Sequence, residues 1–546
     1  MLPWPEAKGL PYTSPGQRPG KGKPDSGLQA NGLPHRESHK AGHCPATTHA
    51  SACSQGVSPG KISAWVPLLV LFLAGCAVGP NFKRPAAPQV SGYAPGPLGS
   101  TTGTTNMPGG APQHFLSGSD IPAEWWRLFH SKPLDELIEL SLSNNPTIKA
   151  AQAALTMAKE TVLAQRGAYW PSITGSFSAA RQKTSQLISP TPNSGALYFS
   201  LYTPQVSVSY VPDVFGLNRR TMESLKAQEG QARFALMATH ITLSANVAAA
   251  AIQEAALRGQ IDATRQLVDI NSNMLQKLQD QYAKGYAARL DVVAQEAQLA
   301  QVAATLPPLL KLLAQQRDLL SALAGRFPSQ SPAARFELAD LHLPQDLPLS
   351  LPSQLVTQRP DVRQAEESLH AASAEVGIAI ANRLPNITLS ADAGTMALEA
   401  GQIFSSPEGF WTLAGGLTQP IFQGGALLHK QRAAKAAYTQ AAEQYRATVL
   451  TAFQNVADTL HALLQDANSL RAAAASRDAA KASLDLARNQ FEAGYSGYLP
   501  FLTAEQAYQQ ASILLVQAQA SRYADTAALF QALGGGWWNR ADLSKN

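Results

Sequence analysis

Cysteine and histidine are the residue types in this sequence that could act as nucleophiles, bases or metal ligands. The three cysteines are Cys44, Cys53 and Cys76, so no disulfide can form within the part of the chain that follows residue 76. Four of the eleven histidines lie in the first 60 residues, and the others are scattered: His114, His130, His240, His342, His370, His429 and His461. We find no metal-ligand spacing, no phosphate-binding glycine loop and no nucleophile elbow. The sequence therefore predicts a protein that is not an enzyme and that carries no metal or other bound cofactor.

Cys76 is the one residue at which the sequence indicates a covalent modification. A lysine and the apolar stretch Trp65–Leu73 precede it, and Leu73-Ala74-Gly75-Cys76 resembles the bacterial lipobox, in which the chain is cut before the cysteine and the cysteine is acylated. The alternative is an apolar core segment that matches by chance. Because no Met lies between Met1 and Cys76, we expect translation to begin near Val57 at a non-ATG codon, which sequencing of the precursor tests.

An internal repeat determines how the rest of the chain is organised. A shift of 209 positions carries residues 216–325 onto residues 425–534 without a gap, so that Gly285-Tyr286 meets Gly494-Tyr495. A shift of 214 relates the segments before these, so the strand region of the second copy is five residues shorter. Each copy reads as a helix, two strands, a very long helix, a glycine-containing turn and a second long helix.

The first of these long helices could run through residues 217–282, which contain no proline and would span about 100 Å. It carries two apolar stripes with heptad-like spacing, which favour the wall of a tube over a coiled coil with one seam. The first stripe is Leu257, Ile261, Val268, Leu275, Leu278 and Tyr282, interrupted by Thr264 and Asn271, and the second is Leu267, Ile270 and Met274. Pro307-Pro308 predicts a break near Leu306 that has no counterpart near Leu515.

The predicted strands alternate apolar residues with small polar ones, as in Ile173–Ala179 and Trp411–Thr418. This pattern is equally typical of a sheet that is wet on one face and of a membrane β-barrel, and the upstream lipobox and Trp411 favour the barrel. Four strands cannot close a barrel, and open sheet edges are not tolerated in lipid. If the strands lie in a membrane, the chain must therefore form an oligomer.

Composition excludes two other classes of protein. The formal net charge is +5, but the first 60 residues contribute six Lys or Arg against three Asp or Glu, and the chain from Cys76 onward is close to neutral. There is no basic face of the kind that binds nucleic acid. No run of 18 apolar residues indicates a transmembrane helix.

Several motifs in order resemble the outer membrane efflux protein family, the outer membrane factors that include lipoproteins of the NodT and OprM type and TolC. They are Leu73-Ala74-Gly75-Cys76-Ala77-Val78-Gly79-Pro80-Asn81, Trp125-Trp126-Arg127-Leu128-Phe129, Asn144-Asn145-Pro146, Arg359-Pro360-Asp361-Val362-Arg363 and Pro420-Ile421-Phe422-Gln423-Gly424-Gly425. The resemblance implies a mixed α and β fold, in which duplicated long helical hairpins form a periplasmic tube. Four strands from each of three chains would close a 12-stranded barrel in the outer membrane. A non-Asp residue after the lipidated cysteine, here Ala77, implies sorting to that membrane.

The resemblance also implies where the functional residues lie. The turns at Gly285-Tyr286 and Gly494-Tyr495 would line the periplasmic mouth and contact a periplasmic adaptor protein, which joins the channel to an inner-membrane pump, expected to be of the RND type. Asp291 stands at a gate carboxylate of the family. Phe491 replaces a gate tyrosine, Ser496 a gate arginine, and Pro500 and Thr503 two aspartates. We therefore expect the mouth to close through apolar packing of Phe491, Tyr495, Tyr498 and Leu499, with glycine caps at Gly285 and Gly494 and Asp291 as a charge at a helix start.

We divide the chain into a leader, a signal peptide, a tether, two repeats joined by a connector, and a tail: residues 1–60, 61–75, 76–124, 125–335, 336–358, 359–534 and 535–546. The predicted function is a lipid-anchored outer membrane duct of a tripartite efflux system in a Gram-negative bacterium. The alternatives are the outer membrane component of type I protein secretion and a periplasmic coiled-coil lipoprotein that forms no channel. The exported substrate cannot be inferred, because the pump selects it.

Overall fold

The protein is described by a computed structural model, which covers residues 77–96, 99–104, 107–183, 198–405 and 409–540. The first repeat consists of α2 (Lys132–Asn144), α3 (Pro146–Arg166), β2 (Ser172–Lys183), β3 (Tyr198–Tyr210), α4 (Leu217–Ala283), α5 (Arg289–Ala304) and α6 (Leu306–Leu323). The second, which α7 (Pro352–Gln358) of the connector precedes, consists of α8 (Pro360–Ala381), β5 (Asn386–Thr395), β6 (Gly409–Thr418), α9 (Ala426–Glu492) and α10 (Tyr498–Ala532). The predicted order of elements is confirmed in both copies.

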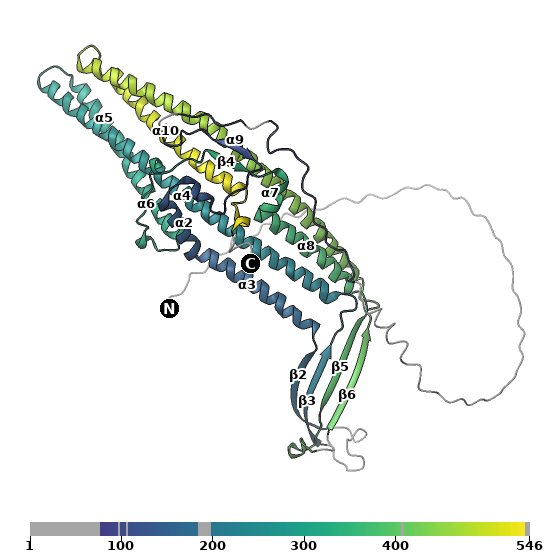
Figure 1. The fold of residues 1–546 in the computed structure, drawn as a ribbon. Helices are drawn as coiled ribbons and strands as arrows, with labels where there is room; N and C mark the ends of the chain where they lie inside the picture. The colour runs from purple at the N-terminus through teal and green to yellow at the C-terminus, as the bar shows by residue number, and fades with distance from the viewer. Residues whose placement is uncertain (1–76, 97–98, 105–106, 184–197, 406–408, 541–546) are drawn as a thin grey trace, which may run out of the picture. The chain divides into compact units, whose positions relative to one another are not determined.

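The two long helices, α4 and α9, have the same length of 67 residues, or about 100 Å each. Each begins after a glycine in the left-handed region, Gly216 (φ 79°) and Gly425 (φ 82°). Because β3 leads into α4 and β6 leads into α9, the sheet lies at one end of these helices and the turns lie at the other (Figure 1). The helix that follows the turn is broken in the first copy, where α5 ends at Ala304 and α6 begins at Leu306, whereas α10 is continuous. The break predicted from Pro307-Pro308 is thus confirmed.

The helices pack around α4, which contacts α3 and α8 toward the sheet and α5, α6 and α10 toward the turn. Its buried seam draws on both predicted stripes, since Leu257, Ile261 and Leu278 of the first and Leu267 and Met274 of the second are all buried. Thr264 and Asn271 are buried in the same seam. One window of α4 is long and apolar enough to cross a membrane, but 61% of that window is buried inside the protein, as in the core helix of a soluble bundle.

The main core lies where the repeats meet the connector. Trp125 is fully buried and stacks on Phe530 of α10 at 5.3 Å between ring centroids, and Phe129 and Tyr523 pack beside them. A short parallel pair that the sequence did not predict, β1 (His114–Ser117) with β4 (Asp346–Leu349), joins the N-terminal tether to the connector here. The tether and the connector are therefore parts of the folded structure.

The second sheet has the order β2-β3-β5-β6, with every neighbouring pair antiparallel. Cross-strand register aligns an apolar row over all four strands, Ile173, Val208, Ala391 and Leu413. The adjacent row, on the opposite face, is Thr174, Ser207, Asp392 and Thr412. The sheet thus has one apolar face and one polar face, as the alternation predicts.

Candidate functional site

The turns between the long helices have the same geometry in both repeats. Gly285 (φ 78°) and Gly494 (φ 77°) adopt the left-handed conformation after α4 and α9. The next residue then donates its backbone N–H to a carbonyl five residues earlier, from Tyr286 to Gln281 at 2.8 Å and from Tyr495 to Gln490 at 2.9 Å. This is a Schellman cap, in which glycine avoids the steric penalty of a left-handed backbone. The side chains of Tyr286 and Tyr495 are 83% and 87% exposed.

Replacing Gly494 with Ala should therefore loosen this turn without a steric clash. No atom lies within 4 Å of the position that a Cβ would occupy, so only the left-handed backbone is penalised. We expect a loss of about 1–2 kcal/mol in local stability. Amide hydrogen exchange of residues 484–502 should accelerate, while exchange in the equivalent turn at Gly285 stays unchanged. Equal exchange in the two proteins would contradict the left-handed cap.

A small apolar core, here called the tip cluster, joins the two hairpins next to the turns. Its buried members are Met274 and Leu278 of α4, Val292 of α5, Leu484 and Ala487 of α9, and Tyr498, Phe501 and Ala504 of α10. Phe491 is half-buried against it, with its ring centroid 6.0 Å from that of Tyr498 and 6.2 Å from that of Phe501. The tip cluster is thus the apolar contact between the two hairpins at the turn end of the long helices.

The predicted apolar group at the mouth divides in two. Phe491 and Tyr498 belong to the tip cluster, but Tyr495 and Leu499 do not, and Leu499 is 70% exposed in the single chain. Tyr498 opens α10 and faces inward, and the next residue points about 100° away around the helix. Leu499 and Tyr495 are therefore available to partners outside the chain rather than to the packing within it.

Asp291 lies in the first turn of α5, where a negative charge stabilises the helix, and is half-buried. Burial raises the pKa of the Tyr498 hydroxyl well above its ordinary value, and the carboxylates of Glu505 and Asp291 add to the effect. The ion pairs near the turns that the described residues form involve Glu492 instead: its Oε1 lies 2.6 Å from Lys277 Nζ and 2.9 Å from Arg488 Nε. This pair could not be inferred from the sequence, because Lys277 and Glu492 are far apart in the chain.

A buried chain of hydrogen bonds, the tip network, crosses from α10 to α5 and α4. The Tyr498 hydroxyl donates to Gln295 Oε1, and Gln295 Nε2 donates to Asn271 Oδ1 at 2.8 Å. Asn271 Nδ2 in turn donates to Glu505 Oε1. Two features of the sequence could have revealed the network: Asn271 interrupts an apolar stripe, and Glu505 is the repeat partner of Glu296. The pattern alone did not show that the two meet.

The start of the described chain is held at the junction of the sheet and the helices. Val78 N–H donates to Phe215 O at 3.2 Å, and Ala77 Cα lies 2.7 Å from the position that a Cβ on Gly216 would take. The buried guanidinium of Arg220 in α4 donates to Val78 O at 2.9 Å and to Gly79 O at 3.2 Å. These contacts of Ala77, Val78 and Gly79 are here called the clamp. Cys76, the predicted lipidation site, lies outside the described residues and directly precedes Ala77 in the sequence.

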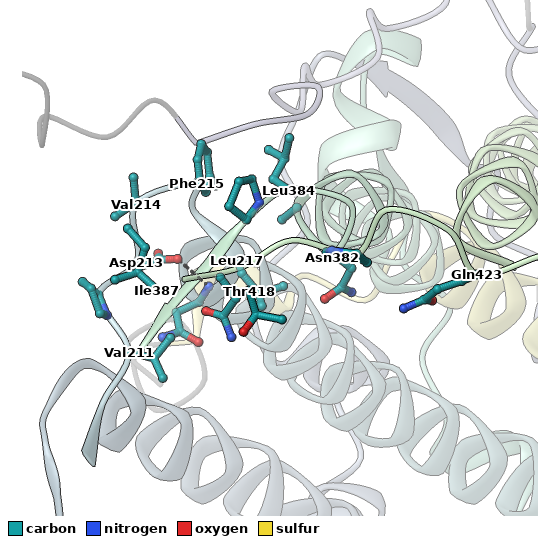
Figure 2. Close-up of a pocket in the computed structure, with 16 residues that line it drawn as sticks. Val211, Asp213, Val214, Phe215, Leu217, Asn382, Leu384, Ile387, Thr418 and Gln423 are labelled. Carbon is teal, nitrogen blue, oxygen red and sulfur yellow. Dashed lines mark hydrogen bonds between the residues drawn. The ribbon is translucent and has the colours of Figure 1, made fainter. Parts of the chain in front are cut away.

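A pocket of about 380 Å³ lies at the same junction, between the segment after β3 and the ends of α8, β5 and β6 (Figure 2). Its charged residue, Asp213, accepts the backbone N–H groups of Asn218 at 3.0 Å and Arg219 at 2.9 Å and so caps α4. Its other polar groups include the amides of Asn382 and Gln423. Across the residues that the structure describes, no group of three potential metal ligands converges, here or elsewhere.

Comparison with known proteins identifies what this arrangement resembles. The family profile described as outer membrane efflux protein matches residues 137–326 and 351–535. The probable efflux pump outer membrane protein TtgC of Pseudomonas putida is 29% identical over 475 residues, which cover 86% of this chain and 94% of that protein. The toluene efflux pump outer membrane protein TtgF, also of Pseudomonas putida, is 30% identical over 477 residues, which cover 86% and 96%. The solved structure of the outer-membrane channel OprN superposes with a TM-score of 0.75 at 25% identity, over 85% of this chain and all of that one.

Proposed function

The chain belongs to the outer membrane efflux protein family, and we propose that three copies of it form a passive exit duct across the outer membrane and the periplasm. It is an outer membrane protein of an efflux system, as its relatives are. The observation that carries the proposal is the four-stranded sheet, which is apolar on one face and polar on the other and lies at the end of two helices of about 100 Å.

The faces of this sheet suit a barrel wall. Ile173, Trp411 and Leu413 on the apolar face are 73%, 79% and 75% exposed in the single chain, and a lipid contact would remove that exposure from water. On the other face Ser207 donates to Asp392 Oδ1 at 2.6 Å, and hydroxyl and carboxylate groups suit a water-filled lumen. The strands of 10 to 13 residues meet the length that a tilted membrane strand needs, about 9–11 residues.

The two unpaired edges of the sheet support the proposal that three copies assemble. In the described chain β2 and β6 pair on one side only, and lipid does not tolerate the unpaired backbone groups on their other side. Pairing β6 of one copy with β2 of the next satisfies both edges at once. Three copies supply 12 strands, whereas one copy supplies fewer than the eight of the smallest bacterial barrels. The mass of the detergent-solubilised particle should therefore be that of three chains.

The turns at the other end are proposed as the contact with a periplasmic adaptor, which connects the duct to an inner-membrane pump of the RND type. Tyr286, Leu290, Tyr495 and Leu499 leave large apolar surfaces exposed in the single chain. Exposed apolar groups that are clustered rather than scattered are typical of a protein interface. The proposed gate lies beside the same two turns, and in it Phe491 and Tyr498 hold the second hairpin against the first.

The duct is proposed to pass small toxic molecules. Toluene and antibiotics appear in the names of relatives from Pseudomonas putida. Deleting the gene should raise the accumulation of such compounds in the cell, and a plasmid copy should restore export. If accumulation stayed normal and a secreted protein disappeared from the medium instead, the chain would serve type I protein secretion.

Cys76 is proposed to carry the lipid anchor. The clamp on Ala77 and Val78 supports this, because consecutive Cα atoms lie about 3.8 Å apart and the acyl chains would start beside the junction of sheet and helices. Cells fed labelled palmitate should therefore label the wild-type protein and not Cys76→Ser. The trimer should persist in the variant, because the barrel alone holds it in the membrane. Equal labelling of the two proteins would refute Cys76 as the site.

A further inference from the structure

Glu505 is a fully buried carboxylate between the two helical hairpins. It lies on α10 and has no exposed surface, and its Oε1 accepts a hydrogen bond from Asn271 Nδ2 of α4. Its second oxygen, Oε2, is buried without a hydrogen-bond partner among the described residues. An ionised carboxylate in such a place is poorly solvated, so the packing of these helices depends on whether Glu505 carries a charge.

The charged groups of the surrounding helices do not neutralise Glu505. On α4, Lys277 is engaged with Glu492 of α9, which also receives Arg488, and on α9, Lys481 pairs with Asp485 at 2.9 Å. On α5 and at the start of α10, the titratable groups that face this region are Asp291 and Tyr498, neither of which offers a positive charge at neutral pH. The only polar support that Glu505 receives in the described chain is the amide of Asn271.

Burial raises the pKa of Glu505 to about 7 against an ordinary value of 4.5, although the hydrogen bond from Asn271 opposes the rise. The packed hairpins therefore bind the proton more tightly than hairpins that have separated and hydrated the carboxylate. The stabilisation is complete below pH 4.5, decreases as the pH rises, and is lost above about pH 7.

Resting on the proposed duct, we propose that Glu505 is a pH-dependent switch of its mouth, in which the protonated side chain keeps α10 packed against α4 and α5 and the ionised side chain loosens that contact. The tip network connects Glu505 to the residues beside the turn of the second hairpin. Tyr498, at the other end of the network, belongs to the tip cluster and lies three residues after Tyr495 of the turn. A charge on Glu505 thus weakens both the polar and the apolar contact between the hairpins.

The repeat supplies a matched control for this switch. Glu296 of α5 is the equivalent of Glu505 under the shift of 209, but its side chain is exposed. Because water solvates the exposed side chain of Glu296, a charge on it should not affect the packing of the two hairpins. Only the second copy buries its glutamate, so only the contact of α10 should respond to pH through this position.

Spin labels at the two turns test the proposal without depending on conduction. Because the chain has no cysteine after Cys76, Lys284→Cys and Ala493→Cys place labels at equivalent, exposed positions of the two turns. Pulsed electron paramagnetic resonance of the reconstituted protein should give a narrow distance distribution at pH 5 and a broader, longer one at pH 8. In the limit of full hydration, the ratio of packed to loosened hairpins falls by about tenfold per pH unit between pH 4.5 and 7.

Three variants decide the outcome. Glu505→Gln keeps the acceptor for Asn271 without a charge and should remain narrow at both pH values, whereas Glu296→Gln should broaden like the parent. Asn271→Ala removes the hydrogen bond that favours ionisation and should move the transition to higher pH. Glu505 is not the only acid with a raised pKa among the described residues: burial and the neighbouring Asp525 also raise the pKa of Asp466. The comparison with Glu505→Gln separates the two sites. If Glu505→Gln broadened at pH 8 as much as the parent, or the parent did not respond to pH, the proposal would be overturned.

Discussion

Leu413→Arg is expected to abolish stable insertion of this protein into the outer membrane. Leu413 lies in the middle of β6, on the apolar face, and its side chain is 75% exposed in the single chain. An arginine near the midplane on the lipid side of a barrel costs about 2–4 kcal/mol per copy, and three copies would each bear that cost. Fractionation of cell envelopes should show the variant degraded or lost from the outer membrane.

Thr412→Arg is the matched control for this experiment. It lies one position away on the opposite face, in the row that contains Ser207 and Asp392. An arginine there faces water in the proposed lumen and can pair with Asp392, so the variant should assemble and alter ion selectivity instead. If Thr412→Arg were the variant that failed to insert, the assignment of the two faces would be reversed.

The double replacement of Tyr498 and Leu499 with Ala should open the periplasmic mouth. Tyr498 is buried in the tip cluster and donates to Gln295, so its truncation leaves a cavity, which typically costs about 3 kcal/mol or more for a large aromatic side chain. Leu499 contributes less within the chain, because it is 70% exposed. Single-channel conductance should rise, and cells should become sensitive to large antibiotics such as vancomycin.

Asp291→Ala should change conductance little by comparison. Asp291 stabilises the start of α5, and charge–dipole contacts at an exposed helix end contribute only about 0.3–1 kcal/mol. The residues at the other family gate positions, Ser496, Pro500 and Thr503, carry no charge with which it could pair. A strong gain of conductance in Asp291→Ala, with none in the double variant, would show that the mouth closes electrostatically.

The sequence predicts the long-range architecture of this chain well, because the repeat has no gap and because glycine and proline residues mark the ends of its helices. The first long helix was expected over residues 217–282 and is Leu217–Ala283, since glycine at both ends and the absence of proline determine its length. The prolines after Thr305 likewise placed the break between α5 and α6. Alternation of residues was sufficient to assign the two faces of the sheet, because successive side chains of a strand point to opposite faces.

Contacts between distant segments could not be predicted in the same way. The four-residue strands β1 and β4 are too short to show a period, and more than 200 residues separate them in the sequence. The apolar stripes of α4 were read as two separate seams, but members of both stripes are buried in a helix that contacts α3, α5, α6, α8 and α10. The tip network was missed for the same reason, since the partners of Asn271 lie on two other helices.

Conductance of the purified protein in planar lipid bilayers tests whether the protein forms a duct. A trimeric duct should give discrete, long-lived current steps, and the steps should grow when Tyr498 and Leu499 are replaced with Ala. Leu413→Arg, which is not expected to insert, should give no steps at the same protein concentration. A wild-type protein that is folded, trimeric and inserted in the bilayer, yet passes no current with either the native or the widened mouth, would contradict a duct.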